Sequence, residues 1–600
     1  MELLVVSIFW ILLLVPGLAV AQRVDRERLE EGGLLPALGL ALTWSALILL
    51  PVAVLCYWIG LPLLVFTIWC GLAAAGGLAL LIRDKAWKPL RTLLLTGLSI
   101  ELAVIIIDAA FAGRVGAMIS ADAVIHVSRI RYLLDHGLNN YDHFVGPPHP
   151  YPVYHTNLLY ALVASCAQVA RLEPIVVWHL SLPMAKVAIL VGVAQLAFAI
   201  TRRPWAAWMA ALFVLGARGP VPFLIYPNQL APYCLIPLII AFTIQAIVGP
   251  CRWTDVVRIV GLGLLLGAVH AMYAGFALLA LGPLLAVWTV VAIVRKKDNR
   301  WRLVALGVLL LISAGSMPLA SRVMDRPGDV AHLHELTDGP RGDADAPDDQ
   351  RDVGRGGTRL ADDADIAAPV LDAYADRFHQ LAGGWAMLKW NAEFHGRYGL
   401  QVALFAAALV LGWLFRRRFE AIALLVIAAS IWIWCYTPLS TIILRAIGAD
   451  WAVLRLVALL GVLTIVAFPA MSALALDRTA RPWWLRSLGS LVALFVGALL
   501  FAPDPPYDWP TYWSDAVDSS ASRDNALEDY LDRARAVESL ADSGSLIAAP
   551  AVIGTRSLMT TDAFILAPAR GSLGIPDLPE RREALYRLFD SRASVRERAA

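Results

Sequence analysis

Long apolar runs, separated by short polar segments, occupy most of this chain. A helix of about 20 predominantly apolar residues crosses the hydrocarbon core of a bilayer. The pattern therefore predicts an all-α polytopic membrane protein with about 13–15 transmembrane helices. The predicted spans are residues 2–21, 34–58, 62–83, 92–112, 175–200, 204–218, 229–249, 257–275, 276–294, 303–320, 398–415, 420–436, 452–475 and 485–502. The split near residue 275 divides an almost continuous apolar region.

Short basic loops give the predicted orientation, because loops rich in Lys and Arg stay on the cytoplasmic side. Four such loops lie at residues 83–91, 295–302, 416–418 and 478–486. Placing all four loops on the cytoplasmic side agrees with successive spans that cross the membrane in opposite directions. Three longer segments then lie outside, at residues 113–174, 321–397 and 503–600.

Residues 156–171 do not fit simple alternation, because the segment is apolar but short. Counting it as a span would move Arg202 and Arg203 outside. We interpret it as re-entrant or interfacial. If it does cross, a further crossing near 219–232 must compensate.

The external segments have a different composition from the spans. Residues 338–365 are rich in Asp, Gly and Arg, as expected of a mobile acidic insert. Residues 366–381 can form an amphipathic helix, and the tryptophans that follow suit the headgroup layer. The tail is predicted to be a small external α/β domain, with helices at 524–540 and 579–589 and strands near 545–553 and 563–567.

These patterns divide the chain into five parts. They are N-terminal transmembrane helices (1–91), a transmembrane module with the external loop 113–174 (92–320), an external loop (321–397), C-terminal transmembrane helices (398–502) and an external domain (503–600).

Composition supports the membrane class. The chain is 59% hydrophobic and 16% charged, with mean hydropathy +0.65, whereas soluble domains carry about 25% charged residues. A net charge of +2 says nothing about nucleic acid, and no nucleic-acid partner is predicted. The six cysteines show no C-x-x-C spacing, which argues against a zinc site or a disulfide framework.

A short polar stretch after the span at 92–112 holds the main candidate chemistry. Ser120 is a suitable N-cap for a helix over residues 121–136. Asp122, His126 and Arg129 then fall on one face of that helix. We expect the helix to lie on the membrane, apolar side down and polar side toward a cavity. An ordinary interfacial helix with an Asp–His pair is the alternative.

Further polar residues follow in a proline-rich loop. His143, His149 and His155 stand at spacings that match no specific metal site. Later, Tyr226 to Pro232 interrupts an apolar run, where Asn228 and Gln229 suit contacts to the hydroxyls of a ligand. A proline-bounded turn is the alternative.

These motifs resemble the GT-C glycosyltransferases. The resemblance rests on Asp122-Ala-x-x-His126 followed by a basic helix, and on Tyr151-Pro152 before the next apolar helix. Tyr226-Pro-Asn-Gln-Leu-Ala-Pro232 and His270 are similar to bacterial members. It covers roughly residues 92–320. Many members carry two acids in this loop, whereas here the second is not evident.

The resemblance implies an inverting glycosyltransferase of EC 2.4 type in the cell membrane, with its active site facing outside. Its partners would be a polyprenyl-phosphate-linked sugar, a glycan or lipid acceptor of the cell envelope, and membrane lipids. Asp122 is the predicted catalytic base. The predicted substrate-binding residues are His126, Arg129, Arg131, His149, Tyr151, Asn228, His270, Arg322, Glu393, His395 and Arg397. No metal ligand is assigned, and a divalent cation stays an open alternative.

Three other functions fit the same composition. A transporter or flippase of lipid-linked saccharide would hold ionisable residues inside its spans, where Asp108 and Lys186 stand. A polysaccharide polymerase or ligase would use the loop 321–397. A non-catalytic scaffold would lack a cavity beside Asp122. The arginines assigned to substrate binding could instead only snorkel to the membrane interface. For His270 the alternative is a hydrogen-bonded ring packed between helices.

Overall fold

A computed structural model gives the fold of the chain. It describes residues 1–112, 116–117, 121–139, 156–218, 224–295, 300–324, 378–381, 385–389, 419–447, 452–460, 462–463, 466, 546–547 and 564–565.

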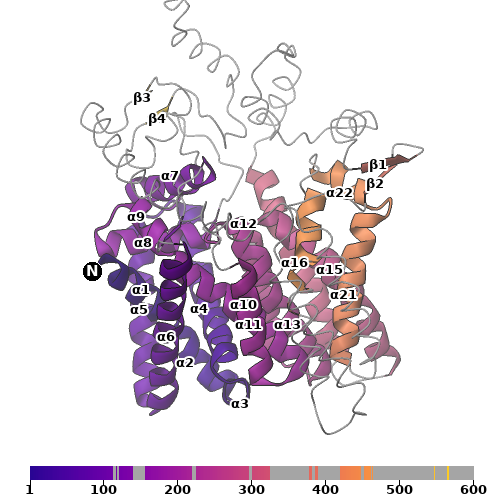
Figure 1. Cartoon of the computed structure of the whole chain (residues 1–600), viewed down its shortest axis with the longest axis horizontal. Helices are drawn as coiled ribbons and strands as arrows, with labels where there is room; N and C mark the ends of the chain where they lie inside the picture. The colour runs from indigo at the N-terminus through magenta and orange to yellow at the C-terminus, as the bar shows by residue number, and fades with distance from the viewer. Residues whose placement is uncertain are drawn as a thin grey trace, which may run out of the picture.

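Tightly packed helices form a bundle, and most of them run between its two ends (Figure 1). In its N-terminal half the helices are α1 Glu2–Leu12, α2 Val15–Val24, α3 Arg26–Glu31, α4 Leu34–Ile59, α5 Leu63–Arg83, α6 Trp87–Ala112, α7 Ala121–His136, α8 Leu158–Ala170, α9 Pro174–Leu180, α10 Leu182–Thr201 and α11 Pro204–Arg218. They continue with α12 Pro227–Leu230, the π-helix η1 Ala231–Leu235, α13 Ile236–Val248, α14 Trp253–Val269, α15 Ala271–Val294, α16 Arg300–Met324, α21 Phe419–Tyr436 and α22 Ser440–Ile447.

The described residues include seven helices that are long and apolar enough to cross a membrane. They are Glu2–Val24, Leu34–Ile59, Leu63–Arg83, Trp87–Ile107, Leu182–Thr201, Pro227–Val248 and Ala271–Val294. The predicted all-α polytopic class is confirmed. The predicted spans 398–415 and 485–502 lie outside the described residues, so the total of about 13–15 stays a prediction.

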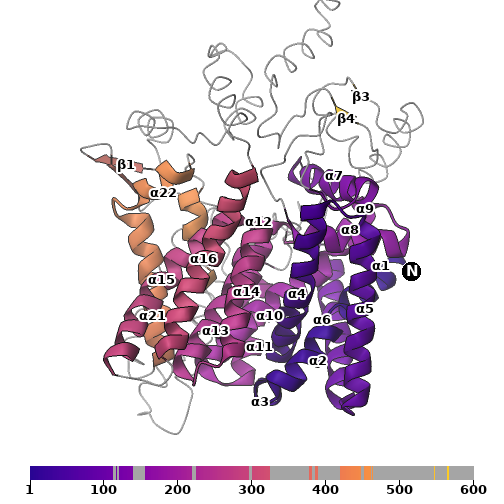
Figure 2. The ribbon, with the colours of Figure 1, turned by 180° about the vertical axis from the view of Figure 1, so that it is seen from behind.

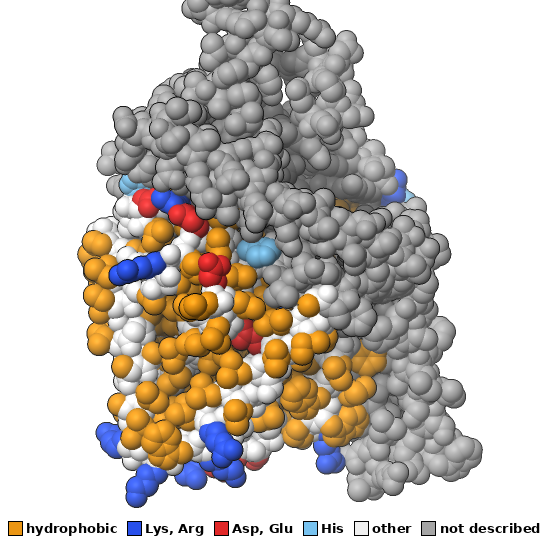
Figure 3. All heavy atoms as spheres, turned by 60° about the vertical axis from the view of Figure 1, so that its left-hand side comes forward, with side chains coloured by type: hydrophobic (Ala, Val, Ile, Leu, Met, Phe, Trp, Pro, Cys, Tyr) orange, Lys and Arg blue, Asp and Glu red, His pale blue; other side chains and the backbone are white. Residues whose placement is uncertain are grey.

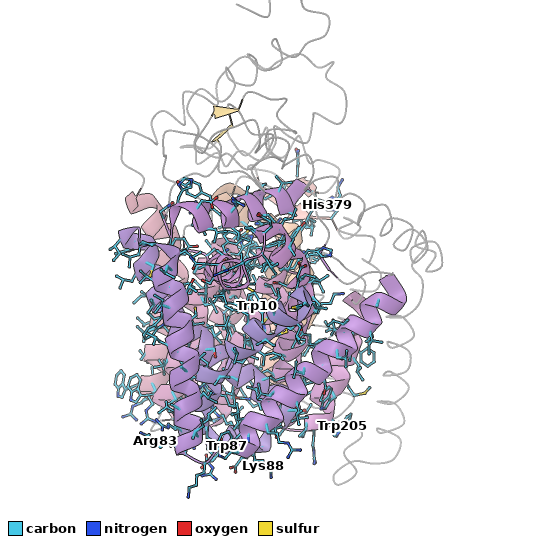
Figure 4. The ribbon with its side chains drawn as sticks, turned by 90° about the vertical axis from the view of Figure 1, so that its left-hand side faces the viewer. Trp10, Arg83, Trp87, Lys88, Trp205 and His379 are labelled. Atoms are coloured by element: carbon cyan, nitrogen blue, oxygen red, sulfur yellow. The ribbon has the colours of Figure 1, made fainter. Side chains whose placement is uncertain are left out.

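The two ends of the bundle differ in charge. Arg83, Trp87, Lys88 and Trp205 lie at one end, which we call the basic end (Figure 4). Helix α7 lies across the opposite end, which we call the α7 end, as Figure 2 shows from behind. One flank is largely apolar, with Lys and Arg gathered at its basic end (Figure 3). The described residues of the predicted basic loops 83–91 and 295–302 thus share one end, opposite α7, whereas the predicted basic loops 416–418 and 478–486 lie outside the described residues.

The first span is broken rather than continuous. Pro16 stands in the first turn of α2, where its missing N–H costs no helical hydrogen bond. Beyond the break, α2 approaches α4 closely, and Gly17 N donates to Ser45 Oγ at 2.9 Å. A Cβ atom at Gly17 would lie only 1.9 Å from the carbonyl oxygen of Ala41. A glycine is therefore required at this contact.

Helices α14 and α15 meet at His270, where the backbone is extended. The predicted boundary at 275/276 is therefore wrong by about one turn. The apolar pattern is almost uniform across this region, so it could not fix the position of the break. His270 is thereby held at the α7 end, between two long helices.

Helices α8 and α9 form a bent pair at the α7 end, which we interpret as re-entrant and call the re-entrant element. Their axes are bent by 111° at the break. Before α8, Asn157 Nδ2 donates to the carbonyl oxygen of Val269 at 3.3 Å. After α8, Glu173 pairs with Arg131 of α7 at 2.7 Å. Both ends of α8 thus lie near the α7 end, which agrees with the re-entrant interpretation of residues 156–171.

Four short strands are described. Strand β1 (Phe378–Leu381) pairs antiparallel with β2 (Trp385–Leu388). The predicted helix 366–381 is therefore wrong at its last four residues, and its other residues lie outside the described ones. Strands β3 (Leu546–Ile547) and β4 (Phe564–Ile565) pair in parallel, at the places where the tail was expected to hold strands. The predicted tail helices lie outside the described residues.

A buried ion network joins the N-terminal helices to α14 at the basic end. Arg258 is fully buried and lies 3.2 Å from Asp25, and it is also paired with Asp255. Asp255 is paired with Arg28 as well, and Trp44 Nε1 donates to Asp25 at 2.8 Å. Two acids and two arginines thus neutralise one another away from water.

A second ion pair at the basic end is open to solvent. Arg23 Nε donates to Asp84 Oδ2 at 2.7 Å, and this hydrogen bond holds the pKa of Asp84 below its usual value. The pair connects the ends of α2 and α5. Because both groups are exposed, we assign it little stabilising effect.

Candidate functional site

Helix α7 covers the site and has the bounds predicted from the sequence. Its apolar residues Ala123, Val127 and Ile130 are fully buried, and the helix packs against α8 and α9. The apolar side of α7 was expected to rest on the membrane. Instead it rests on the re-entrant element, which turns its His126 inward.

Four aromatic rings meet beneath α7, and we call them the aromatic cluster: His126, Tyr160, Trp178 and Tyr226. His126 Nδ1 lies 2.5 Å from the hydroxyl of Tyr160, in hydrogen-bond contact. The imidazole stacks on Trp178 with ring centroids 5.5 Å apart, and it contacts Tyr226 at 5.2 Å. Each ring comes from a different segment, namely α7, α8, α9 and the residue before α12.

The cluster is buried. His126 is 6% exposed and Trp178 is 0% exposed. A buried polar ring is costly unless it is hydrogen-bonded, and Tyr160 supplies that bond. The orientation of His126 is therefore fixed by its surroundings rather than by solvent.

A second group of polar side chains lies close to the cluster. His270 contacts Tyr273 edge to face, with ring centroids 4.9 Å apart. The charges of Arg455, from the helical residues 452–460, and of His126 both act on His270. Two imidazoles and a guanidinium from distant parts of the chain thus interact electrostatically.

Asn157 connects these two groups and is fully buried. Its Oδ1 accepts from Leu159 N at 3.0 Å and so caps α8. Its Nδ2 donates to the carbonyl oxygen of Val269, the residue before His270. The backbone carbonyl oxygen of Asn157 accepts from the Tyr57 hydroxyl at 3.1 Å. One side chain therefore holds α8 and the α14–α15 break in register.

An apolar cavity of about 180 Å³ lies directly beside the site. Its lining residues come from α1 and the two residues after it, and from α4, α8, α10, α12, η1, α13 and α14; they include Trp10, Leu42, Leu162, Ala188, Leu230 and Leu265. Three further lining residues, Leu159, Ile225 and Val269, each directly precede a site residue. The site therefore has a polar part and an adjoining apolar part.

The two predicted arginines of α7 are held by other protein groups. Arg129 is 1% exposed and donates to the carbonyl oxygen of Asn139. Arg131 forms ion pairs with Asp135 and Glu173, each at 2.7 Å. Both therefore fix the C-terminal part of α7 and the residues after it, and of the described side chains on this face His126 is the one in the cluster.

The turn before η1 holds buried polar atoms without partners. Asn228 Oδ1 and Gln229 Oε1 are buried and make no hydrogen bond within the described part of the chain. Trp178 Nε1, in the aromatic cluster, is also buried and makes no hydrogen bond within the described part of the chain. Such atoms are uncommon in folded proteins and mark places where a ligand or water can bind. The π-helix that follows is a further feature frequent at functional sites.

The remaining predicted residues have no described side chains. Asp122 lies in the first turn of α7, one helical turn before His126, and Arg322 lies in α16. His149, Tyr151, Glu393, His395 and Arg397 lie outside the described residues. Among the described residues, no group of three or more His, Cys, Asp or Glu is placed to hold a metal ion.

Tyr160, Trp178, Asn157 and Arg455 were not predicted as site residues. Tyr160 and Trp178 sit in apolar helices where an aromatic residue is ordinary. Arg455 stands inside a predicted span, and that position was the available signal, because arginines within spans are rare and face the bundle interior.

The fold and the site define a helical multi-pass membrane protein with a buried polar cluster under a surface helix. The chain belongs to the family DUF6541, a family of unknown function, whose model matches residues 10–331, more than half of the chain. The matched region contains the aromatic cluster and His270, whereas Arg455 lies beyond it. Among curated proteins the chain has no match.

Two crystal structures of an oligosaccharyltransferase from Archaeoglobus fulgidus are similar to the chain. One, tethered to an acceptor peptide containing the NVT sequon, is 12% identical with a TM-score of 0.39, over 78% of this chain and 64% of that one. The other, in complex with Zn and sulfate, is 12% identical with a TM-score of 0.36, over 68% and 53%. The chain thus spans less than two thirds of that protein's length. These values are too low to transfer a residue role or an activity.

Proposed function

We propose that the chain is an inverting membrane glycosyltransferase that moves a sugar from a polyprenyl-phosphate donor to a cell-envelope acceptor at the α7 end. That end would face outside the cytoplasmic membrane, because the described residues of the basic loops 83–91 and 295–302 lie at the opposite end. The observation that carries the proposal is the juxtaposition of a buried polar cluster and an apolar cavity. Such a site suits a substrate with a polar head and a hydrocarbon chain.

We assign the deprotonation of the acceptor hydroxyl to Asp122. The acceptor hydroxyl oxygen attacks the anomeric carbon of the sugar while its proton passes to the carboxylate. The bond between that carbon and the phosphate oxygen breaks, and the polyprenyl phosphate leaves with the electron pair. General-base help of this kind is worth about 10²–10⁴-fold in rate.

The other residues bind and orient. Arg455, whose charge acts on His270, is suited to the phosphate, since arginine binds phosphate oxygens in a bidentate manner. Asn228 lies where its free oxygen can accept from a sugar hydroxyl. A divalent cation bridging the phosphate is compatible with this scheme, and its ligands would have to include residues outside the described ones.

A transporter of lipid-linked saccharide is the second candidate, and one observation favours it. Glu101 is 2% exposed within the span Trp87–Ile107, where Ser7 donates a hydrogen bond to its carboxylate. Lys186 is 2% exposed in the span Leu182–Thr201. Ionisable groups inside spans are typical of transport pathways.

The test uses the full chain in liposomes with polyprenyl-phosphate-linked, radiolabelled hexoses and pentoses and a cell-envelope glycan extract as acceptor. We expect release of polyprenyl phosphate and label in the glycan, and a loss of about 10²-fold or more in Asp122→Asn. The matched control is Asp135→Asn on the same helix, which loses one of the two ion pairs of Arg131 and leaves the pair with Glu173, so it should keep its rate. Label that crosses the bilayer still attached to its lipid would instead support the transporter.

A further inference from the structure

Two residues between α6 and α7, Gly116 and Ala117, are held against α9 by His179. Ala117 N donates to the carbonyl oxygen of His179 at 2.9 Å, and His179 Nδ1 lies 2.8 Å from the carbonyl oxygen of Ala117. A carbonyl oxygen can only accept, so Nδ1 carries a proton and donates it to this bond. Both backbone polar groups of Ala117, which is 1% exposed, are therefore bonded to one residue.

The sequence around α9 leaves the carbonyl oxygen of His179 open to this contact. His179 lies in the last turn of α9, where carbonyl groups have no partner within the helix. The residue four positions later is Pro183, which has no N–H with which to continue the helical pattern. Ala117 supplies the missing donor, as the pairing of buried backbone groups requires.

Gly116 fits the imidazole ring of His179. A Cβ atom at Gly116 would lie only 2.2 Å from His179 Nε2, so the ring occupies the space that any other side chain would need. Gly116 also has φ +151°, which residues with a Cβ atom rarely adopt. The ring and the backbone thus each require a glycine at this position.

Helix α9 holds the chain on both sides of Asp122. Trp178 stacks on His126, which stands four residues after Asp122. His179, the next residue of α9, bonds to Ala117, five residues before Asp122. Asp122 itself lies in the first turn of α7, so the start of that helix is tied to α9 from both directions.

We propose that His179 is a positioning residue that gives the first turn of α7, with Asp122, one position relative to the aromatic cluster. The proposal rests on the proposed function, because it concerns the base of that reaction. His179 acts through Gly116 and Ala117 and touches neither the sugar nor the phosphate. Its effect therefore belongs to the rate of the reaction and not to the binding of the substrate.

This role predicts a particular pattern in the kinetics. A displacement of about 1 Å in a reacting group can lower the rate about 10²-fold. Loss of the His179 donor should thus lower kcat by about 10-fold or more. The value of KM should change by less than about 3-fold, since an interaction that matters only in the transition state does not alter it.

Spin labels measure the position of α7 without any substrate. One label is attached at Asp122→Cys and the other at Val169→Cys, an exposed residue of α8, in the full chain in nanodiscs. The six native cysteines are buried and should not take the label. Double electron–electron resonance then gives the distribution of distances between the two labels. Sugar transfer is measured on the same His179, Gly116 and control variants without the labels.

Three substitutions vary the contact, and a fourth is the control. His179→Leu removes the donor, whereas His179→Asn keeps an amide N–H near the position of Nδ1. Gly116→Ala places a Cβ atom against the ring. Thr67→Val on α5 is the matched control, because it loses hydrogen bonds to Ser165 and Gln168 of the re-entrant element but no contact to residues 116–117.

We expect one narrow distribution in the unchanged chain, in Thr67→Val and in His179→Asn, and a broad one in His179→Leu and Gly116→Ala. The transfer rate should follow the same division. The double variant should lose less than about 3-fold beyond either single one, because both act on one contact. Either of these two variants alone suffices if the other does not fold.

An unchanged distribution in both variants would overturn the proposal, and so would His179→Asn as broad as His179→Leu. The distances also separate this proposal from the proposed function, because they need no substrate. A broadened distribution in His179→Leu, together with no transfer by the unchanged chain, removes the proposed function alone. Transfer by the unchanged chain, with the same rate and distances in His179→Leu, removes the positioning role alone.

Discussion

His126 and Tyr160 lie 34 residues apart in the sequence, yet Nδ1 of the one and the hydroxyl of the other are 2.5 Å apart. The first belongs to the surface helix α7 and the second to the re-entrant helix α8. This bond joins the helix that carries Asp122 to the element that borders the apolar cavity. The relative position of the proposed base and the apolar cavity therefore depends on it.

Replacing Tyr160 by Phe removes that hydroxyl and keeps the ring. A buried imidazole nitrogen without its partner costs about 1–3 kcal/mol of stability. We expect transfer to fall about 10-fold, equivalent to about 1.4 kcal/mol in the barrier. Thermal unfolding and the liposome assay measure the two effects. Tyr57→Phe is the control, because it also loses one buried hydrogen bond of a hydroxyl, to Asn157, but no contact to His126. An equal loss of transfer in both variants would contradict a specific role for Tyr160.

Asn157→Ala removes two side-chain bonds at once. The lost cap of α8 costs about 1 kcal/mol, and the lost donor to Val269 leaves a buried carbonyl unpaired, which adds about 1–3 kcal/mol. We expect the free energy of unfolding to fall by about 2–4 kcal/mol. Asn157→Ser keeps a capping oxygen without adding a buried charge and loses the amide donor, so it should restore about 1 kcal/mol of this loss. Equal losses in Asn157→Ser and Asn157→Ala would show that the cap contributes nothing.

The sequence predicted the elements better than it predicted the site. Helix 121–136 was found because a capping residue, an apolar face and a polar face all lie within one short stretch. Residues 378–381 form a strand only because 385–388 pair with them, and a helical pattern does not reveal that contact. Tyr160, Trp178 and Arg455 join the site through packing between distant segments. Hydrophobic periodicity cannot show which of many buried side chains will meet.

The ion network at the basic end should contribute strongly to stability. Arg258→Met leaves Asp25 and Asp255 buried with fewer cationic partners, and removing one member of a buried pair costs about 3–5 kcal/mol. Arg252→Ala is the matched control, because Arg252 pairs at 2.9 Å with Glu27 while both remain exposed. That pair is worth about 1 kcal/mol or less. Thermal unfolding in detergent compares the two, and similar losses would mean that the buried network is no stronger than a surface pair.

Cysteine labelling tests the re-entrant path of α8. The six native cysteines are buried, so they should not react with a membrane-impermeant maleimide. Glu173 and Arg83 are both exposed, the first just after α8 and the second at the basic end. Because α8 returns to the α7 end, Glu173→Cys and Arg83→Cys should be labelled from opposite sides, in intact spheroplasts and in inside-out vesicles respectively. Labelling of both from the same side would mean that α8 crosses the membrane. The aromatic cluster would then have to be assembled differently from the arrangement described here.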